Sequence, residues 1–287
     1  MYDVAIIGAG PAGLSAALNL KLHNRSILWF GNKGQSRKVA LSEKIANYPG
    51  VPMVSGEELN RRFFAQAEEM GLEITDKMVT KIMPTKKGFQ LLGDDEIYEA
   101  KSVLLAGGSV SAKGFPGEAE LLGRGVSYCA TCDGFLYRGK TIAVYCGDKR
   151  FEHEVAYLAG LAFKVYLFTS YRDVSVAQEN VEWQSSPVRA VNGDRRVTSL
   201  LLADGAELPV DGFFILRSAI APTTLLYGLE MDGPHIVVDR SCATNKTGVF
   251  AAGDCTGRPY QIAKAVGEGN VAAHSILEYL AALEKQA

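Results

Sequence analysis

Short runs of consecutive apolar residues, rich in β-branched side chains, recur along the chain between segments of helical composition. Such runs are typical of parallel strands buried on both faces, and their alternation with helices indicates an α/β fold. The predicted buried strands cover residues 4–7, 26–30, 102–106, 141–145, 164–168, 213–216 and 248–252. The predicted helices cover residues 14–22, 55–70, 152–161 and 261–283.

Two stretches do not follow this alternation. Short apolar runs over 72–74, 79–83, 89–92 and 96–98 predict an antiparallel excursion before strand 102–106, and further short strands are expected over 181–210. Ser55 is placed to cap helix 55–70, with Glu58 completing a capping box, and Arg61-Arg62 indicates a solvated face. The turn residues Phe115-Pro116-Gly117 resemble a hinge between domains.

The first predicted strand runs directly into Gly8-Ala9-Gly10-Pro11-Ala12-Gly13. Gly8 makes the turn, Gly10 lets the backbone approach a pyrophosphate, and Gly13 lets the next helix pack against the strand. The free N–H groups of that helix favour a phosphate. This strand–turn–helix context predicts a bound dinucleotide. Asn32, after the second strand, stands where an acid often holds the ribose.

Composition changes the picture mainly by exclusion. The 287 residues suffice for two domains, and a net charge of −2 gives no general attraction to nucleic acid or to anionic membranes. Five cysteines are too few for a secreted disulfide framework. The chain opens on a strand rather than a basic, then apolar leader, and no apolar run reaches the length of a membrane span. We therefore expect a soluble cytoplasmic protein.

The remaining chemistry gathers at Cys129-Ala130-Thr131-Cys132-Asp133. Two cysteines at this spacing can close a disulfide in a tight turn, and in a reducing compartment such a pair is usually catalytic. The acid directly after Cys132 can move a proton. Half of a zinc site is the alternative, but the other cysteines are single and the four histidines do not cluster. We predict a redox dithiol and no metal.

A second strand–turn–helix unit follows, over residues 141–168, with the turn Cys146-Gly147-Asp148-Lys149-Arg150-Phe151. Aligned on the helix, the three small-residue positions of a fingerprint hold Cys146, Asp148 and Phe151. Asp148 adds negative charge where a pyrophosphate would lie, and Phe151 is large where the helix must pack closely. This unit is therefore predicted to bind no nucleotide.

These motifs, in this order, resemble the low-molecular-weight thioredoxin reductases, FAD enzymes of the pyridine nucleotide disulfide oxidoreductase class. The resemblance covers nearly the whole chain. It implies an α/β protein with two Rossmann-like (three-layer ββα) domains and a homodimer. The FAD domain is discontinuous, over 1–113 and 217–287, and the smaller CxxC-bearing domain is inserted over 114–216. The motifs that carry the resemblance are the glycine fingerprint 8–13, Asn47-Tyr48-Pro49-Gly50, residues 125–134 around the dithiol, and residues 248–254.

The resemblance also implies roles for single residues. Cys132 faces the flavin, Cys129 attacks the thioredoxin disulfide and Asp133 transfers the proton. Asp254 follows the last strand and can accept hydrogen bonds from cofactor hydroxyls; an ordinary helix cap is the alternative. The predicted FAD-binding residues are Gly8, Gly10, Pro11, Ala12, Gly13, Asn32, Gln35, Asn47, Gly107, Asp254, Gln261 and Ile262.

One departure from the family pattern concerns the electron donor. The family's inserted domain normally binds NADPH, through a glycine turn and a His-Arg-Arg stretch that grips the 2′-phosphate. The matching positions here are Thr169, Ser170 and Tyr171, with Arg172 alone nearby, so the bidentate clamp is missing. That combination resembles the ferredoxin-dependent flavin thioredoxin reductases. Basic residues for an acidic ferredoxin are Arg37, Lys38, Lys149 and Arg150, unless they are only solvated surface.

The sequence leaves three alternatives to ferredoxin-driven thioredoxin reduction. The degenerate domain could hold a second flavin, stacked on aromatic side chains such as Tyr145 and Phe151. An altered pocket could still accept NAD(P)H. A flavin-binding redox sensor, whose dithiol responds to oxidation without turnover, is the alternative that is not an enzyme.

Overall fold

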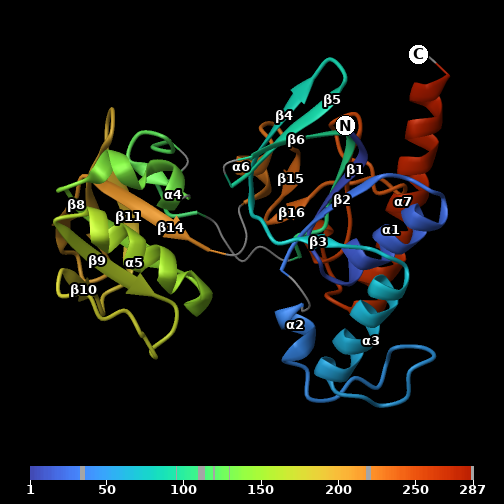
Figure 1. Ribbon diagram of the computed structural model, residues 1–287, viewed down its shortest axis with the longest axis horizontal. Helices are drawn as coiled ribbons and strands as arrows, with labels where there is room; N and C mark the ends of the chain where they lie inside the picture. Colours follow the sequence, from blue (N-terminus) through green and yellow to red (C-terminus); the bar gives the residue numbers. More distant parts are fainter. Residues whose placement is uncertain are drawn as a thin grey trace. The chain divides into compact units, whose positions relative to one another are not determined.

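The protein is described by a computed structural model that covers residues 1–32, 36–94, 96–108, 114–118, 120–128, 130–217 and 221–285. The chain forms two compact units (Figure 1). Unit 1 comprises Met1–Ser111 and Ala221–Ala287, so it is built from both ends of the chain, and unit 2 comprises Ala112–Ile220. Among the described residues, no helix is both long and apolar enough to cross a membrane.

A seven-stranded sheet forms the centre of unit 1, in the order β3-β2-β1-β6-β5-β4, with β17 also paired to β6. Its strands are β1 (Tyr2–Ile7), β2 (Ile27–Phe30), β3 (Ile74–Thr75), β4 (Val79–Thr85), β5 (Gly88–Gly93), β6 (Glu96–Leu105) and β17 (Val249–Ala251). Strands β1, β2, β3, β6 and β17 pair in parallel with one another, whereas β5 pairs antiparallel with both β6 and β4.

Two expectations for this sheet were wrong. The short strands predicted over 96–98 and 102–106 are one continuous strand, β6, whose first half pairs with β5 and whose second half pairs with β1 and β17. The first strand of the predicted antiparallel excursion, β3, instead extends the parallel sheet beside β2. Local composition does not record either feature, because the partners of a strand are set by its tertiary context.

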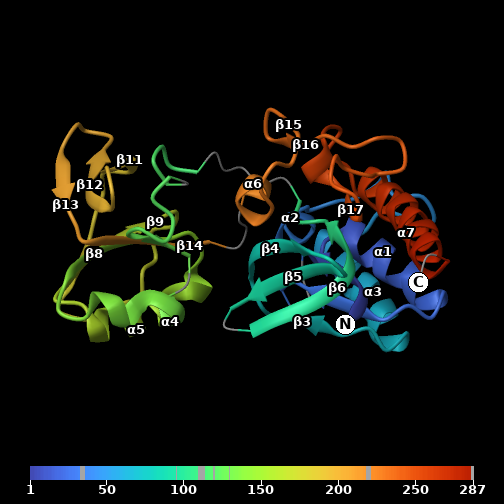
Figure 2. The same ribbon diagram turned by 90° about the horizontal axis from the view of Figure 1, so that it is seen from above.

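Helices α1 (Pro11–Leu22) and α7 (Ile262–Glu284) lie side by side in both views (Figures 1 and 2). Leu14, Leu20 and Ile276 share one buried cluster with the apolar side chains of β1. A Cβ on Gly269 would lie 2.2 Å from the carbonyl oxygen of Ala12, so the two backbones touch only because this residue is glycine. The other short elements of unit 1 are α2 (Arg37–Ala40), α3 (Gly56–Glu69), α6 (Pro222–Leu225), β15 (Met231–Asp232), β16 (His235–Ile236) and the 3₁₀ turn η3 (Asp254–Thr256).

Helix α3 begins as predicted, but its capping box is only half formed. The Ser55 side chain accepts a hydrogen bond from the Glu58 N–H at 3.2 Å. The Glu58 carboxylate does not reach back to the cap: it binds the guanidinium groups of Arg61 and Arg62 at 2.8 and 2.7 Å. Arg61 and Arg62 therefore neutralise the Glu58 carboxylate of their own helix, in addition to facing solvent.

Unit 2 has three layers (Figure 2). Its parallel sheet has the order β10-β9-β8-β14-β7, and α4 and α5 lie on one face while the antiparallel strands β11–β13 lie on the other. The strands are β7 (Val126–Ser127), β8 (Thr141–Cys146), β9 (Lys164–Thr169), β10 (Val181–Trp183), β11 (Val188–Gly193), β12 (Val197–Leu202), β13 (Glu207–Pro209) and β14 (Gly212–Leu216). The helices are α4 (Ala130–Asp133) and α5 (Glu152–Leu161), with 3₁₀ turns η1 (Gly134–Tyr137) and η2 (Lys149–Phe151).

The segment Phe115-Pro116-Gly117 is packed within unit 2. The Phe115 ring lies 5.5 Å from Phe213 and 5.3 Å from Tyr145, and the Pro116 carbonyl accepts from the Val191 N–H at 2.8 Å. A side chain held between two aromatic rings belongs to a core. The hinge prediction therefore does not hold for these three residues.

Candidate active site

The glycine turn after β1 has the geometry of a phosphate-binding cradle. Gly8 has φ +122°, a conformation that side-chain-bearing residues rarely adopt, and a Cβ on Gly13 would lie 2.0 Å from the Gly8 carbonyl oxygen. At Gly10, by contrast, a Cβ would meet nothing within 4 Å. No side chain caps the amino end of α1, where Pro11 and Ala12 stand. Two glycines thus close the turn, and the third leaves open space at a helix N-terminus.

Three more predicted residues lie at the same edge of the sheet, because the carboxyl ends of parallel strands point the same way. Asn32 follows β2 and is exposed. Gly107 follows β6, and a Cβ there would meet nothing within 4 Å. Asp254 follows β17 in η3. The topology therefore places these residues at the edge that holds the open turn.

Segments far apart in the sequence meet in front of α7. The Asn47 amide donates to the Gln261 side chain at 2.9 Å, and the Lys38 ammonium lies 2.5 Å from the Asp254 carboxylate. Ile262 begins α7 and packs against the small core of Val39, Ile45 and Leu59. Gln35 lies outside the described residues.

Asp254 is not the cap of the long helix. Helix α7 begins at Ile262, its N-cap residue is Gln261, and no side chain caps it. The Asp254 carboxylate is instead directed at Lys38. The interpretation of Asp254 as an ordinary cap was therefore wrong, and this carboxylate can also accept hydrogen bonds from a ligand.

Two residues that the sequence reasoning missed hold the turn around Asp254. The Glu268 carboxylate accepts from the Gly253 N–H and from the Thr256 hydroxyl, both at 2.8 Å. The Lys264 ammonium donates to the Gly253 and Gly257 carbonyls at 2.7 and 2.8 Å. Lys264 and Glu268 also pair with each other across one turn of α7, at 3.1 Å. The spacing of four residues between Lys264 and Glu268 is the sequence feature that could have indicated this ion pair.

The dithiol segment begins at the edge strand β7 of unit 2. Cys132 is disulfide-bonded, and it lies in the short helix α4. Cys129 lies outside the described residues. Cys146, Cys242 and Cys255 are free, buried thiols. The Ser127 hydroxyl donates to the Asp133 carboxylate at 2.6 Å, which fixes the acid beside Cys132.

Comparison with known proteins shows which family combines such a glycine turn with a disulfide. The family described as pyridine nucleotide-disulphide oxidoreductase matches residues 2–147 and 171–269. The chain belongs to this family. Thioredoxin reductase from Treponema pallidum (strain Nichols) is 35% identical over 304 residues, which cover 99% of this chain and 98% of that protein.

Similar solved structures also belong to thioredoxin reductases. A ferredoxin-flavin thioredoxin reductase from Clostridium acetobutylicum is 41% identical, with a TM-score of 0.92 over 99% of this chain and 98% of that chain. A thioredoxin reductase from Gloeobacter violaceus is 30% identical, with a TM-score of 0.80 over 98% of this chain and 94% of that chain. The chain is thus a flavin disulfide oxidoreductase of the thioredoxin reductase type, and its cofactor is FAD. The open turn at Gly10 and the open surface at Gly107 fit that cofactor.

Within this family pattern, the second strand–turn–helix unit is closed by its own side chains. Glu152 is the first residue of α5, and its carboxylate accepts from the Tyr171 hydroxyl at 3.0 Å and from the Ser175 N–H at 3.1 and 3.2 Å. The Tyr171 hydroxyl also lies 3.3 Å from Cys146 Sγ, and the Ser170 hydroxyl donates to the Gly147 carbonyl at 2.8 Å. The loop after β9 is thereby tied across the carboxyl end of β8.

Among the side chains that close this turn, only the Glu152 carboxylate carries a charge. Burial, together with its hydrogen bond to Cys146, raises the pKa of Tyr171, and burial raises the pKa of the Cys146 thiol. Both groups therefore stay protonated at neutral pH. Asp148 meanwhile caps the 3₁₀ turn η2 through the Arg150 N–H, at 3.2 Å.

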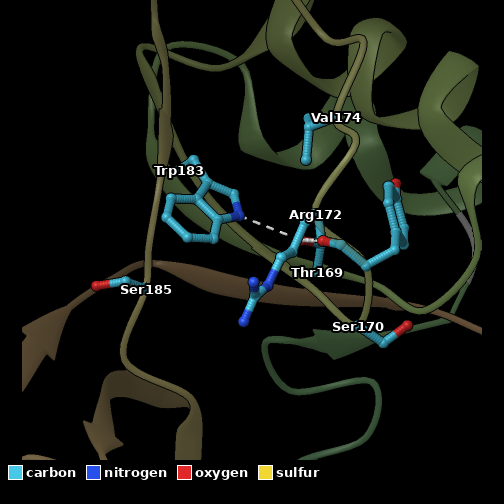
Figure 3. Close-up of a pocket in the computed structure, with 7 residues that line it drawn as sticks. Thr169, Ser170, Arg172, Val174, Trp183 and Ser185 are labelled. Atoms are coloured by element: carbon cyan, nitrogen blue, oxygen red, sulfur yellow. Dashed lines mark hydrogen bonds between the residues drawn. The ribbon is translucent and has the colours of Figure 1, made fainter.

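Outside the closure lies a pocket of about 720 Å³ (Figure 3). Trp183 donates its indole N–H to the Thr169 hydroxyl at 3.1 Å, as the dashed line in Figure 3 shows. The other lining residues are Ser170, Tyr171, Arg172, Val174 and Ser185. The pocket contains one guanidinium and several hydroxyls, and no arginine pair that could grip a phosphate from two sides.

Proposed function

We propose that the chain reduces the disulfide of thioredoxin through the pair Cys129–Cys132, with electrons from reduced ferredoxin rather than from NAD(P)H. The 41% identical structure from Clostridium acetobutylicum is a ferredoxin-flavin thioredoxin reductase, which supports ferredoxin as the donor. The relative from Treponema pallidum supports the acceptor, because it is a thioredoxin reductase.

The observation that carries the choice of donor is the closed turn of unit 2. In a nucleotide-binding βαβ unit, the pyrophosphate lies on the N–H groups at the start of the helix. Here the Glu152 carboxylate stands at that end of α5 and is held by Tyr171 and Ser175. A dinucleotide would bring its negative charge beside Glu152 and beside Asp148, whose carboxylate already accepts from the Arg150 N–H of this turn. Both effects disfavour NADPH and leave the dithiol untouched.

When bound, FAD can accept single electrons and pass on a pair, which a one-electron donor and a two-electron disulfide require. The residues of the cradle and of the Asp254 turn would hold it. For a ferredoxin near −400 mV and a thioredoxin near −270 mV, the difference of about 130 mV corresponds to roughly 6 kcal/mol for two electrons. The direction of transfer is therefore favourable.

The chain's own residues complete the exchange. Two electrons arriving at Cys132 break the S–S bond, and Cys129 is released as a thiolate. The Cys129 thiolate attacks the thioredoxin disulfide and forms a mixed disulfide. Cys132 then attacks Cys129 Sγ, which re-forms the internal disulfide and releases thioredoxin as a dithiol. Asp133, fixed by Ser127, is placed to supply and accept the proton.

The surface beside the dithiol suits a protein substrate. Phe135 and Leu136 lie two and three residues after Asp133 and are 59% and 53% exposed. Exposed apolar side chains next to a reactive disulfide favour contact with another protein surface. A homodimer and a cytoplasmic location stay predictions from the sequence.

The test is anaerobic thioredoxin reduction with photoreduced ferredoxin as the only donor, compared with NADPH and NADH. We expect turnover with ferredoxin and none with either nucleotide. Rapid bleaching of the flavin by micromolar NADPH would defeat the proposed donor. A Cys129→Ser protein that still reduced thioredoxin would defeat the dithiol mechanism, and two flavins per chain by absorbance would indicate a second carrier.

A further inference from the structure

An exposed aromatic residue stands between two cations just before α7. The Tyr260 ring, in a residue that is 36% exposed, lies 4.5 Å from the Lys38 ammonium and 5.6 Å from the Arg258 guanidinium. Its hydroxyl lies 2.7 Å from His235 Nε2, so the ring is fixed from β16 as well. Cations over an aromatic face are held by its quadrupole. The ring therefore gathers both cations into one exposed cluster.

The positive charge here is local. Unit 1 as a whole is close to neutral, as is the chain with its net charge of −2. Lys38 and Arg258 nevertheless lie against the same ring within this nearly neutral unit. Arg258 adds to this side through Tyr260, and the Asp254 carboxylate is directed at Lys38. We name Lys38, Arg258 and Tyr260, with His235 behind them, the Tyr260 cluster.

The Tyr260 cluster adjoins the residues predicted to hold the flavin. Tyr260 is followed directly by Gln261, whose side chain binds Asn47 at 2.9 Å. Lys38 touches both the Tyr260 ring and Asp254. A protein that settles on this cluster would therefore lie over the edge of the flavin site, and short separation between redox centres is what electron transfer between proteins requires.

We propose that the Tyr260 cluster is the docking surface of the ferredoxin that donates electrons to the flavin. This inference rests on the proposed function. Charge complementarity selects the occupant: ferredoxins are generally acidic, and carboxylates on such a protein can pair with Arg258. Lys38 pairs with Asp254, but its side chain is 58% exposed and borders the same ring. Contacts of this kind mainly steer encounter and orientation, and redox complexes use small, weak interfaces.

The experiment compares charge reversals at the two ends of one helix. Arg258→Glu changes the charge next to the start of α7, and Lys285→Glu makes the same change at its far end, roughly 35 Å away at 1.5 Å per residue. Arg258→Lys keeps the charge. Flavin reduction is followed by stopped-flow absorbance with reduced ferredoxin, over a series of salt concentrations. Photoreduced 5-deazaflavin, a small uncharged donor, reports whether the flavin site itself is intact.

At low salt, Arg258→Glu should slow reduction by ferredoxin about tenfold, and the difference should shrink as salt rises. Arg258→Lys and Lys285→Glu should behave as wild type, and all four proteins should be reduced equally by deazaflavin. Equal ferredoxin rates and salt dependence in wild type and Arg258→Glu would overturn the docking surface, as would an equal loss with deazaflavin. Failure of ferredoxin to reduce the wild-type flavin would overturn the proposed function instead.

Discussion

Replacing Glu118 with glutamine should destabilise unit 2 far more than the change in shape suggests. Glu118 is 2% exposed, and its carboxylate accepts from the Tyr128 hydroxyl at 2.6 Å and from the Phe115 N–H at 2.7 Å. Its counterion is the Arg217 guanidinium, which also lies over the Tyr128 ring at 5.5 Å. Glutamine fills the same space, but its amide has one accepting oxygen where the carboxylate has two. The substitution therefore removes the negative charge and one of the two accepted hydrogen bonds.

The magnitude follows from burial of the pair. The Arg217 side chain is only 12% exposed, and its Nε atom is buried without a hydrogen-bond partner in the described part of the chain. Removing the carboxylate leaves this guanidinium buried and uncompensated. Breaking a buried ion pair by removing one partner costs about 3–5 kcal/mol. Because Tyr128 directly precedes Cys129, the loss should also loosen the backbone next to the dithiol.

Native-state hydrogen exchange resolved by peptide is the suitable assay, because it reports each unit of the chain separately. Amides of β14 should lose protection by about 3–5 kcal/mol in Glu118→Gln, while those of β1 stay unchanged. Glu120→Gln is the matched control, since Glu120 is exposed and two residues away. A loss below about 1 kcal/mol, or an equal loss in the control, would refute the reasoning.

Three glycine substitutions and one labelling experiment have defined outcomes. Gly10→Ala should keep the fold but lower the flavin-to-protein absorbance ratio, because its Cβ enters the open space of the turn. Gly13→Ala should lower both the flavin content and Tm, because its Cβ would lie 2.0 Å from the Gly8 carbonyl oxygen. Gly269→Ala should cost about 1–3 kcal/mol in urea unfolding, because its Cβ would lie 2.2 Å from a carbonyl oxygen of α1. Burial raises the pKa of Cys242 to about 11 and of Cys255 to about 12, so iodoacetamide at pH 8 should leave both unlabelled in the folded protein, by peptide mass spectrometry.

The parts of the fold that could be predicted are those that depend only on residues close together in the sequence. The apolar run 4–7 and the glycines after it require a strand, a tight turn and a close-packed helix, whatever the rest of the chain does. Helix α5 begins and ends at the residues predicted for it, Glu152 and Leu161. The absence of a fingerprint in the turn 146–151 could also be predicted, because Asp148 is charged and Phe151 is large where a phosphate cradle needs small residues.

The parts that could not be predicted depend on partners distant in the sequence. Strand β6 was divided in two because its halves have different neighbours, β5 and β17. The pairing of Glu118 with Arg217 spans 99 residues, and no local pattern indicates it. Glu268 reaches the Asp254 turn only because α7 returns to the sheet beside α1. In each case the sequence supplies suitable side chains, and only the topology brings them together.

The two strand–turn–helix units show how one architecture can be open to a cofactor in one place and closed in another. In unit 1, the helix after the turn has no capping side chain, and a Cβ at Gly10 would meet nothing within 4 Å. In unit 2, the corresponding helix begins with a carboxylate, Glu152, that already accepts hydrogen bonds from Tyr171 and Ser175. The Asp148 carboxylate also accepts from the Arg150 N–H at the start of this turn, so a resident anion already binds an N–H that a phosphate would use. Unit 2 therefore keeps its fold and carries the dithiol, while the only helix start of this pair left open to a phosphate is the one after Gly10.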